Sequence, residues 1–213
     1  MTPRFITFEG GEGSGKSTQA RLLAYRLRAA GHDVLLTREP GGSPFAEAIR
    51  DVILGGRLPA HTPLSEALLF YAARADHLAA SIRPALAAGT WVLCDRFSDS
   101  TRVYQGIAGA LKPGIVDELE ALVVLPTRPN LTLIVDVPVD IGLARADKRR
   151  SSDQADPYER RDGAFHQRLR DGFLAIARDE PQRCIVIDGT RAEAEVAATV
   201  WAAVETRLLQ GAS

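Results

Sequence analysis

The chain has 213 residues, a formal net charge of -1 and 25% charged residues, which suits one α/β domain. Near neutrality argues against a general nucleic-acid binder, whose surface would be strongly basic. No apolar run approaches a membrane span, and the N-terminal MTPRFITFEG lacks the pattern of a signal peptide. We therefore expect a soluble, cytoplasmic protein without nucleic-acid or membrane partners. Cys94 and Cys184 lie in apolar runs, which favours two buried thiols over a disulfide.

Five apolar runs have the length of strands: FITF (5–8), VLLT (34–37), WVLC (91–94), LTLIVDV (131–137) and CIVI (184–187). They are continuous rather than alternating, as in strands that are covered by helices on both faces. Helical patterns separate the strands. One covers 16–30 and another 193–209. A third begins at the N-cap Thr62 and continues through the seventies, with a division near Pro84. This alternation predicts a parallel five-stranded sheet flanked by helices. The polar segment 145–161 predicts a mobile loop between helices.

The first strand leads directly into a phosphate-binding motif. Gly10, Gly15, Lys16 and Ser17 fit G-x-x-x-x-G-K-S/T, with a helical pattern after them. Such a loop points backbone N–H groups at phosphates, while the lysine reaches the β- and γ-phosphates and the hydroxyl binds Mg²⁺. We expect the ATP-binding loop to comprise Gly10, Gly11, Glu12, Gly13, Ser14, Gly15, Lys16, Ser17 and Thr18. The motif alone does not separate a kinase from a motor or a switch, but the N-K-x-D base reader of GTPases does not occur.

Two strands end in an aspartate. Asp95 is followed at once by Arg96, so the pair could bind Mg²⁺ and a second phosphate group. Asp136 could bind the metal instead. Because no arginine accompanies it in the sequence, a carboxylate that caps a nearby loop is the favoured interpretation of Asp136.

Three further segments suggest a second, phosphorylated substrate. In TREPGG, Arg38 follows a strand and is suited to a phosphate, although a surface arginine paired with a neighbour is an alternative. In LLFYAARADH, Phe70 and Arg74 share a helix face, where a ring can stack on a nucleobase and a guanidinium can donate to its carbonyl. An aromatic at this spacing is otherwise a core residue. In DRFSDSTRVYQG, Thr101 and Gln105 share a face that suits the polar edge of a base.

Together, the segments FEGGEGSGKST, TREPGG, FYAARADH, DRFSDSTRVYQG and DPYE…FHQRLRDGFLAIA resemble those of bacterial thymidylate kinases, over nearly the whole chain. The resemblance implies a P-loop NTPase fold of the nucleoside-monophosphate-kinase type over 1–213, with a mobile lid at about 145–160. It implies transfer of phosphate from ATP to dTMP with Mg²⁺, giving ADP and dTDP for dTTP biosynthesis. It also implies a homodimer packed through helices.

The resemblance also implies roles for individual residues. Phe70 would stack on thymine, Arg74 would bond its O4, and Thr101 and Gln105 would meet the base edge. Tyr104 would crowd the 2′ position of the sugar. Arg38 and Arg96 would hold the dTMP phosphate. Glu12 would lie near the 3′-hydroxyl and Arg191 near adenine. The catalytic residues would be Lys16, Arg96, Arg149 and Glu12.

One variant of the family carries a catalytic arginine in the phosphate-binding loop, just after the acid. This chain has Gly13 there, so it resembles the variant whose arginine comes from the lid. The candidates are Arg145, Lys148, Arg149 and Arg150, of which we favour Arg149. Many relatives have D-R-F-E at the end of the lid, where this chain has DPYE at 156–159.

Rival hypotheses remain open at this point. Arg74 argues against cytosine, whose position 4 carries a donor, but it does not exclude uracil and hence a dUMP kinase. A P-loop protein that binds ATP as a switch is a second alternative. A nucleoside kinase is a third, with Glu9 as the general base.

Overall fold

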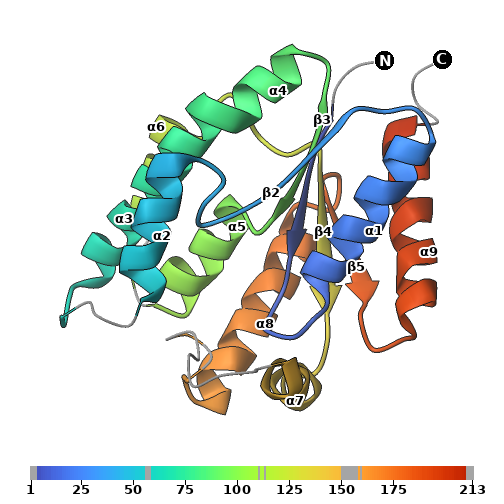
Figure 1. The fold of residues 1–213 in the computed structure, drawn as a ribbon. Coiled ribbons are helices and arrows are strands. Elements are labelled where there is room, and N and C mark those ends of the chain that lie inside the picture. The colour runs from blue at the N-terminus through green and yellow to red at the C-terminus, as the bar shows by residue number, and fades with distance from the viewer. Residues whose placement is uncertain are drawn as a thin grey trace.

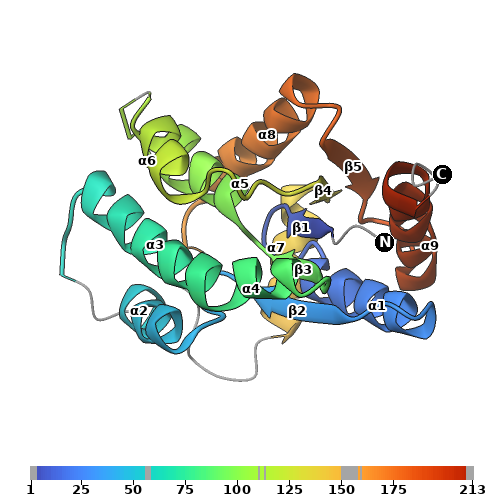
Figure 2. The ribbon, with the colours of Figure 1, turned by 90° about the horizontal axis from the view of Figure 1, so that it is seen from above.

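Five parallel strands form a central sheet in the order β2-β3-β1-β4-β5, with helices on both faces (Figures 1 and 2). The strands are β1 (Phe5–Glu9), β2 (Val34–Arg38), β3 (Trp91–Asp95), β4 (Leu131–Asp136) and β5 (Cys184–Asp188). This confirms the predicted five-stranded sheet. The computed structural model describes residues 4–55, 59–109, 111–112, 114–149, 158 and 160–209.

One face of the sheet is covered by α1 (Lys16–Ala29) and α9 (Glu193–Val204), which lie side by side in both views (Figures 1 and 2). Leu23 and Leu27 of α1 and Val200 of α9 are buried against Ile6 and Phe8 of β1. A π-helical segment, Glu205–Leu209, continues α9. The helix predicted over 16–30 is confirmed except at Ala30, which is exposed just beyond its end.

The opposite face is covered by two groups of helices. The first is α3 (Pro63–His77), α4 (Arg83–Ala87) and α6 (Ile115–Val123), and the second is α5 (Ser98–Thr101) and α8 (Gly163–Asp179). Tyr71 of α3 packs with Phe5, while Phe173 of α8 packs with Ile134. Thr62 caps α3 as predicted, because its hydroxyl accepts the N–H of Ser65 at 3.1 Å.

Several elements differ from expectation. The division predicted near Pro84 takes the form of a π-helical segment, Leu78–Ile82, between α3 and α4. Another π-helical segment, Arg102–Ile107, continues α5. Neither α2 (Pro44–Leu54) nor α6 was predicted from the sequence.

The expected loop over 145–161 is partly helical. Helix α7 (Val139–Arg149) includes its first five residues, so the prediction of a loop is wrong there. Arginine, alanine and lysine favour helices, and polarity alone does not make a loop. Residues 150–157 and 159 lie outside the described residues. Among the described helices, none is long and apolar enough to cross a membrane.

The topology brings distant segments together. Because β1 pairs with β3 on one side and β4 on the other, the loops that follow these three strands are neighbours at one edge of the sheet. Ligands of open α/β sheets bind at the carboxyl ends of the strands. Helix α7 lies beside this edge (Figure 1).

Candidate active site

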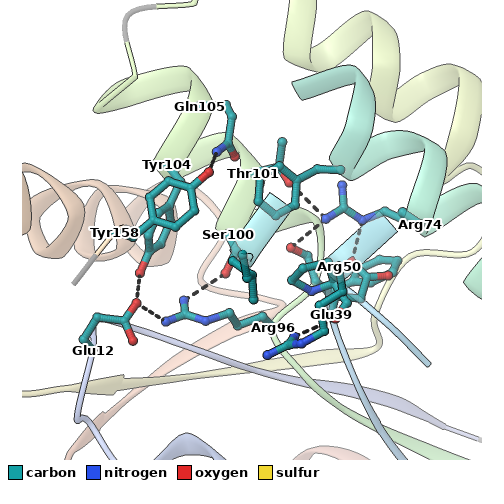
Figure 3. Close-up of a pocket in the computed structure, with 14 residues that line it drawn as sticks. Glu12, Glu39, Arg50, Arg74, Arg96, Ser100, Thr101, Tyr104, Gln105 and Tyr158 are labelled. Carbon is teal, nitrogen blue, oxygen red and sulfur yellow. Dashed lines mark hydrogen bonds and ion pairs between the residues drawn. The ribbon is translucent and has the colours of Figure 1, made fainter. Parts of the chain in front are cut away.

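A pocket lies at this edge, next to the phosphate-binding loop (Figure 3). Every predicted acceptor-site residue except Arg38 lines it. The lining residues are Glu12, Glu39, Pro40, Arg50, Leu54, Phe70, Arg74, Arg96, Phe97, Ser100, Thr101, Tyr104, Gln105 and Tyr158.

The glycine loop curls around the lysine that follows it. Gly10, Gly13 and Gly15 have φ angles of 131°, 64° and 98°, a region that glycine adopts without strain. Lys16 is 6% exposed, and its Nζ donates to the carbonyl of Gly11 at 2.6 Å. Burial, and then the charge of Arg96, lower the pKa of Lys16 to about 8. Helix α1 begins here without a side-chain cap, so its first N–H groups face the loop as donors for an anion.

Two oxygen ligands meet beside the loop. The Ser17 hydroxyl donates to Oδ2 of Asp95, as the adjacency of β1 and β3 requires. A hydroxyl and a carboxylate are hard ligands that fit Mg²⁺, which commonly completes its shell with phosphate oxygens and water. Among the described residues, no group of three or more His, Cys, Asp or Glu side chains lies together to hold a metal by itself.

Arg96 stands between the phosphate-binding loop and the pocket. Its Nη2 donates to Oε1 of Glu12 at 2.7 Å and its Nη1 to the carbonyl of Gly10 at 3.2 Å. Tyr104 donates to the same Glu12 oxygen at 2.7 Å (Figure 3). Burial by itself raises the pKa of Glu12, but the charges of Arg96 and Lys16 outweigh it and hold that pKa at about 2. Glu12 is therefore an anion that fixes a guanidinium at the junction of the two sites.

The backbone of Arg96 is unusual. Its φ is 68°, and it is the one non-glycine residue with positive φ among those described. This conformation costs about 1–3 kcal/mol and persists only where the surroundings enforce it. The enforcing contacts come from Glu9, whose two carboxyl oxygens accept Phe97 N at 2.8 Å and Ser100 Oγ at 2.6 Å.

Glu9 is fully buried, and burial, then the charge of Asp99, raise its pKa to about 8. Because its side chain has no exposed surface, Glu9 cannot serve as the base that the nucleoside-kinase hypothesis required. Its function in this structure is to hold the turn that carries Arg96.

Hydrogen bonds to neighbouring residues also fix the guanidinium of Arg74. Its Nε donates to Glu39 at 2.8 Å, and its Nη2 donates to Phe97 O at 3.2 Å and Thr101 Oγ1 at 3.0 Å. The second oxygen of Glu39 pairs with Nδ1 of His77 at 3.0 Å. Nothing among the described residues accepts a hydrogen bond from Nη1 of Arg74, although that atom is buried. The guanidinium of Arg74, a residue that lines the pocket, thus has one donor atom without an acceptor among the described residues.

Aromatic rings form another part of the wall. The ring of Tyr158 lies 6.3 Å from that of Phe70 and 5.4 Å from that of Tyr104, measured between centroids. The Tyr158 hydroxyl accepts a hydrogen bond from Gln105 at 3.1 Å. In the sequence Tyr158 stands only as part of DPYE at 156–159, because nothing in its spacing connects it to the helices that it meets.

Arg38 does not lie with the other predicted residues. Its side chain is 54% exposed and pairs with Glu47 at 3.0 Å, which is the alternative that the sequence left open. Arg50 of α2 lines the pocket and donates to the carbonyl of Pro40 at 2.7 Å. The signal for α2 was the cap Ser43 followed by Pro44, which starts a helix directly after TREPGG.

Asp136 is interpreted from the sequence as a carboxylate that caps a nearby loop, but both of its side-chain oxygens are paired with an arginine. Arg170 of α8 donates to both of its oxygens, at 2.7 and 2.8 Å. The two residues are 34 positions apart, so sequence proximity could not show the pair. Asp136 is thereby engaged, whereas Asp95 contacts Ser17.

Helix α7 packs directly on the phosphate-binding loop through two glycines. A Cβ added to Gly13 would lie 1.9 Å from the carbonyl oxygen of Gly142, and one added to Gly142 would lie 2.5 Å from that of Glu12. The position of the loop arginine in the other family variant is thus closed to any side chain here.

The predicted adenine segment lies next to the same loop. A Cβ on Gly189 would come within 3.1 Å of the Ser14 carbonyl, and Arg145 of α7 donates to Gly189 O at 2.7 Å. Arg191 is 64% exposed and pairs with Asp188 at 3.3 Å. The backbone of Arg149 ends α7. The side chain of Arg149, and Arg150, lie outside the described residues.

We predict that Glu9→Gln makes stability less dependent on pH. A carboxyl with a raised pKa binds more protons when folded, so wild-type stability falls as pH rises from about 4.5 towards 8. Glutamine cannot ionise, yet its amide can accept from Phe97 N and donate to Ser100 Oγ. From pH 5 to pH 8 the wild type should lose more melting temperature than the variant, by a few degrees, since 1 kcal/mol corresponds to about 2–4 °C at this size.

The matched control is Glu118→Gln, at an exposed position of α6, which should follow the wild type at both pH values. If the difference in melting temperature between the wild type and Glu9→Gln stayed constant with pH, Glu9 would not be the group responsible for the pH dependence of stability.

Comparison with known proteins agrees with this geometry. The model of the thymidylate kinase family matches residues 8–200. The thymidylate kinases of Nitrobacter winogradskyi and Bradyrhizobium diazoefficiens are 55% and 52% identical to this chain, each over 206 residues that cover 97% of it and 90% of the relative. A crystal structure of thymidylate kinase from Ehrlichia chaffeensis is 35% identical, with a TM-score of 0.77, and the match covers 96% of this chain and 99% of that one. The chain therefore belongs to the thymidylate kinase family.

Proposed function

We propose that this chain transfers the γ-phosphoryl group of ATP to dTMP, giving ADP and dTDP. The observation that carries the proposal is the position of Arg96, whose guanidinium touches the phosphate-binding loop at Gly10 and lines the adjoining pocket. One cation thus borders both the site for a triphosphate and the site for an acceptor. Membership of the thymidylate kinase family supports the identity of the acceptor.

The donor half is residues 10–18 with Lys16 at the centre. We assign the β- and γ-phosphates to Lys16 and to the uncapped N–H groups of α1. Ser17 and Asp95 would hold Mg²⁺, which when bound neutralises the phosphate charge. The segment around Gly189 lies beside the loop at Ser14, and we assign this segment and Arg191 to adenine.

The residues that line the pocket are assigned to the acceptor, dTMP. The ring of Phe70 provides a stacking surface for thymine. The Nη1 of Arg74, which has no partner among the described residues, provides a donor for O4 of thymine. Thr101 helps to hold Arg74, and Gln105 meets the base edge. Tyr104 and Glu12, joined by their hydrogen bond, border the sugar. Arg96 and Arg50 hold the monophosphate, and Arg50 takes the role first assigned to Arg38 because Arg50 lines the pocket.

The chemistry needs no general base, since the dTMP phosphate is already an oxyanion near neutral pH. The barrier is the repulsion between two anionic groups that must approach in line. Lys16 and Arg96 lie at that point, and Glu12 fixes Arg96 before any ligand arrives. Such preorganised charges each lower the barrier by about 3 kcal/mol, roughly a hundredfold in rate.

The function is tested with a coupled assay of ADP formation from ATP, using dTMP, dUMP, dCMP and thymidine as acceptors. ADP formation should depend on dTMP and on Mg²⁺, and thymidine should be inactive because the two arginines require a phosphate. A higher kcat/KM for dUMP than for dTMP would replace the proposal with a dUMP kinase. ATP hydrolysis that is indifferent to every acceptor would instead indicate an ATP-dependent switch.

We also propose that residues 145–160 close over the phosphates and that Arg149 supplies the cation that the loop lacks at Gly13. Support comes from α7, which packs on the loop and ends at Arg149. Arg149→Ala should reduce kcat roughly a hundredfold, about 3 kcal/mol of transition-state stabilisation, with little change in the Kd of dTMP. Arg178→Ala, at an exposed position of α8, is the control and should retain activity. Unchanged turnover of Arg149→Ala would transfer the role to Arg145 or Arg150.

Finally, we propose that the chain forms a homodimer through α2, α3 and α6. Large apolar side chains are exposed on these helices, including Val52, Leu68 and Leu122, which is 80% exposed. The three helices lie on the same side of the molecule (Figure 2). Sedimentation equilibrium should give about twice the chain mass of 23.0 kDa, and Leu122→Glu should shift it towards the monomer. A wild-type mass of one chain would contradict the proposal.

A further inference from the structure

The side-chain amide of Gln105 is held between two acceptors. Gln105 is 1% exposed, and its Nε2 donates to Oε2 of Glu66 at 3.2 Å and to the Tyr158 hydroxyl at 3.1 Å. Glu66 belongs to α3 and Tyr158 to the segment beyond α7, so three separate parts of the chain meet at one amide. Sequence analysis assigned no role to Glu66 or to Tyr158.

The chemistry of the partners fixes the orientation of this amide. A carboxylate accepts hydrogen bonds and donates none, so the amide atom beside Glu66 must be the nitrogen. The amide nitrogen has two hydrogens, and Glu66 and Tyr158 account for both. The other oxygen of Glu66 lies 3.4 Å from Nε2 of His61, which restrains the carboxylate further.

The oxygen is therefore the amide atom that remains for a ligand. Figure 3 shows the nitrogen of Gln105 turned towards Tyr158 and the oxygen turned towards the side of Thr101 and Arg74. On that side lies the guanidinium of Arg74, which also lines the pocket and has the opposite polarity, because it has donors and no acceptor. The lining of the pocket thus combines an acceptor on Gln105 with donors on Arg74.

We infer that Glu66 and Tyr158 are specificity-determining positioning residues, which hold Gln105 so that the pocket accepts a base with a ring N–H beside a carbonyl and rejects one with a ring acceptor beside an amino group. Thymine and uracil have the first pattern at N3 and O4, whereas cytosine has the reverse pattern. The inference deepens the proposed function and rests on it for the identity of the ligand. A released amide could turn over and present its NH₂ to cytosine N3.

The selectivity can be measured by equilibrium binding, without turnover. Dissociation constants for dTMP and dCMP are determined by calorimetry for the wild type, Glu66→Gln, Tyr158→Phe and the double variant. Glutamine at 66 can face Gln105 with either end, so the amide is no longer fixed. The ratio Kd(dCMP)/Kd(dTMP) should fall about tenfold, the size of one oriented hydrogen bond. Tyr158→Phe should lower it less, because Glu66 remains, and the double variant should lower it most.

Glu118→Gln makes the same change of charge at an exposed position of α6 and should leave the ratio at the wild-type value. A general loss of packing would weaken both nucleotides by one factor. An unchanged ratio in Glu66→Gln would therefore overturn the inference, as would a wild type that does not prefer dTMP. The ADP assay separates the inference from the proposed reaction. If Glu66→Gln lowers the selectivity but the protein forms no ADP with dTMP, the inference is supported and the proposed reaction is refuted.

Discussion

The ion pair between Arg96 and Glu12 joins the two halves of the site. Glu12 comes from the glycine loop and Arg96 from the turn after β3, and their atoms approach to 2.7 Å with less than a fifth of either side chain exposed. Removing one partner would leave the other as a poorly solvated charge, which is costly. The phosphate-binding loop and the acceptor pocket therefore keep a fixed relation even before a ligand binds.

Arg96 and Arg74, which line the pocket, are held by hydrogen bonds to buried side chains. Glu9 fixes the strained turn of Arg96, and Glu39 with His77 fixes Arg74. Each of these three supports is at most 5% exposed. A site built in this way gives up little conformational entropy on binding, because its side chains are already in place. Its accuracy then depends as much on buried hydrogen bonds as on the residues in contact with the ligand.

Sequence patterns predicted the parts of the fold that depend on local chemistry. The strands follow from continuous apolar runs, and the glycine loop follows from a fixed spacing. The patterns failed where distance in the chain hides proximity in space. Arg170 of helix α8 bonds to Asp136 of strand β4, and Tyr158 contacts Gln105 across 53 positions. Arg38 and Arg50 could be told apart only by their location, one on the exposed end of a strand and the other on a helix whose start went unnoticed.

The contact between Gly13 and Gly142 ties the composition of the phosphate-binding loop to the position of α7. A side chain at position 13 would meet the helix backbone, because its first carbon would lie 1.9 Å from the carbonyl oxygen of Gly142. A larger residue at 142 would meet the loop backbone in the same way, since its Cβ would lie 2.5 Å from the carbonyl oxygen of Glu12. Neither glycine can therefore be replaced unless the helix moves away from the loop, so each position constrains the other.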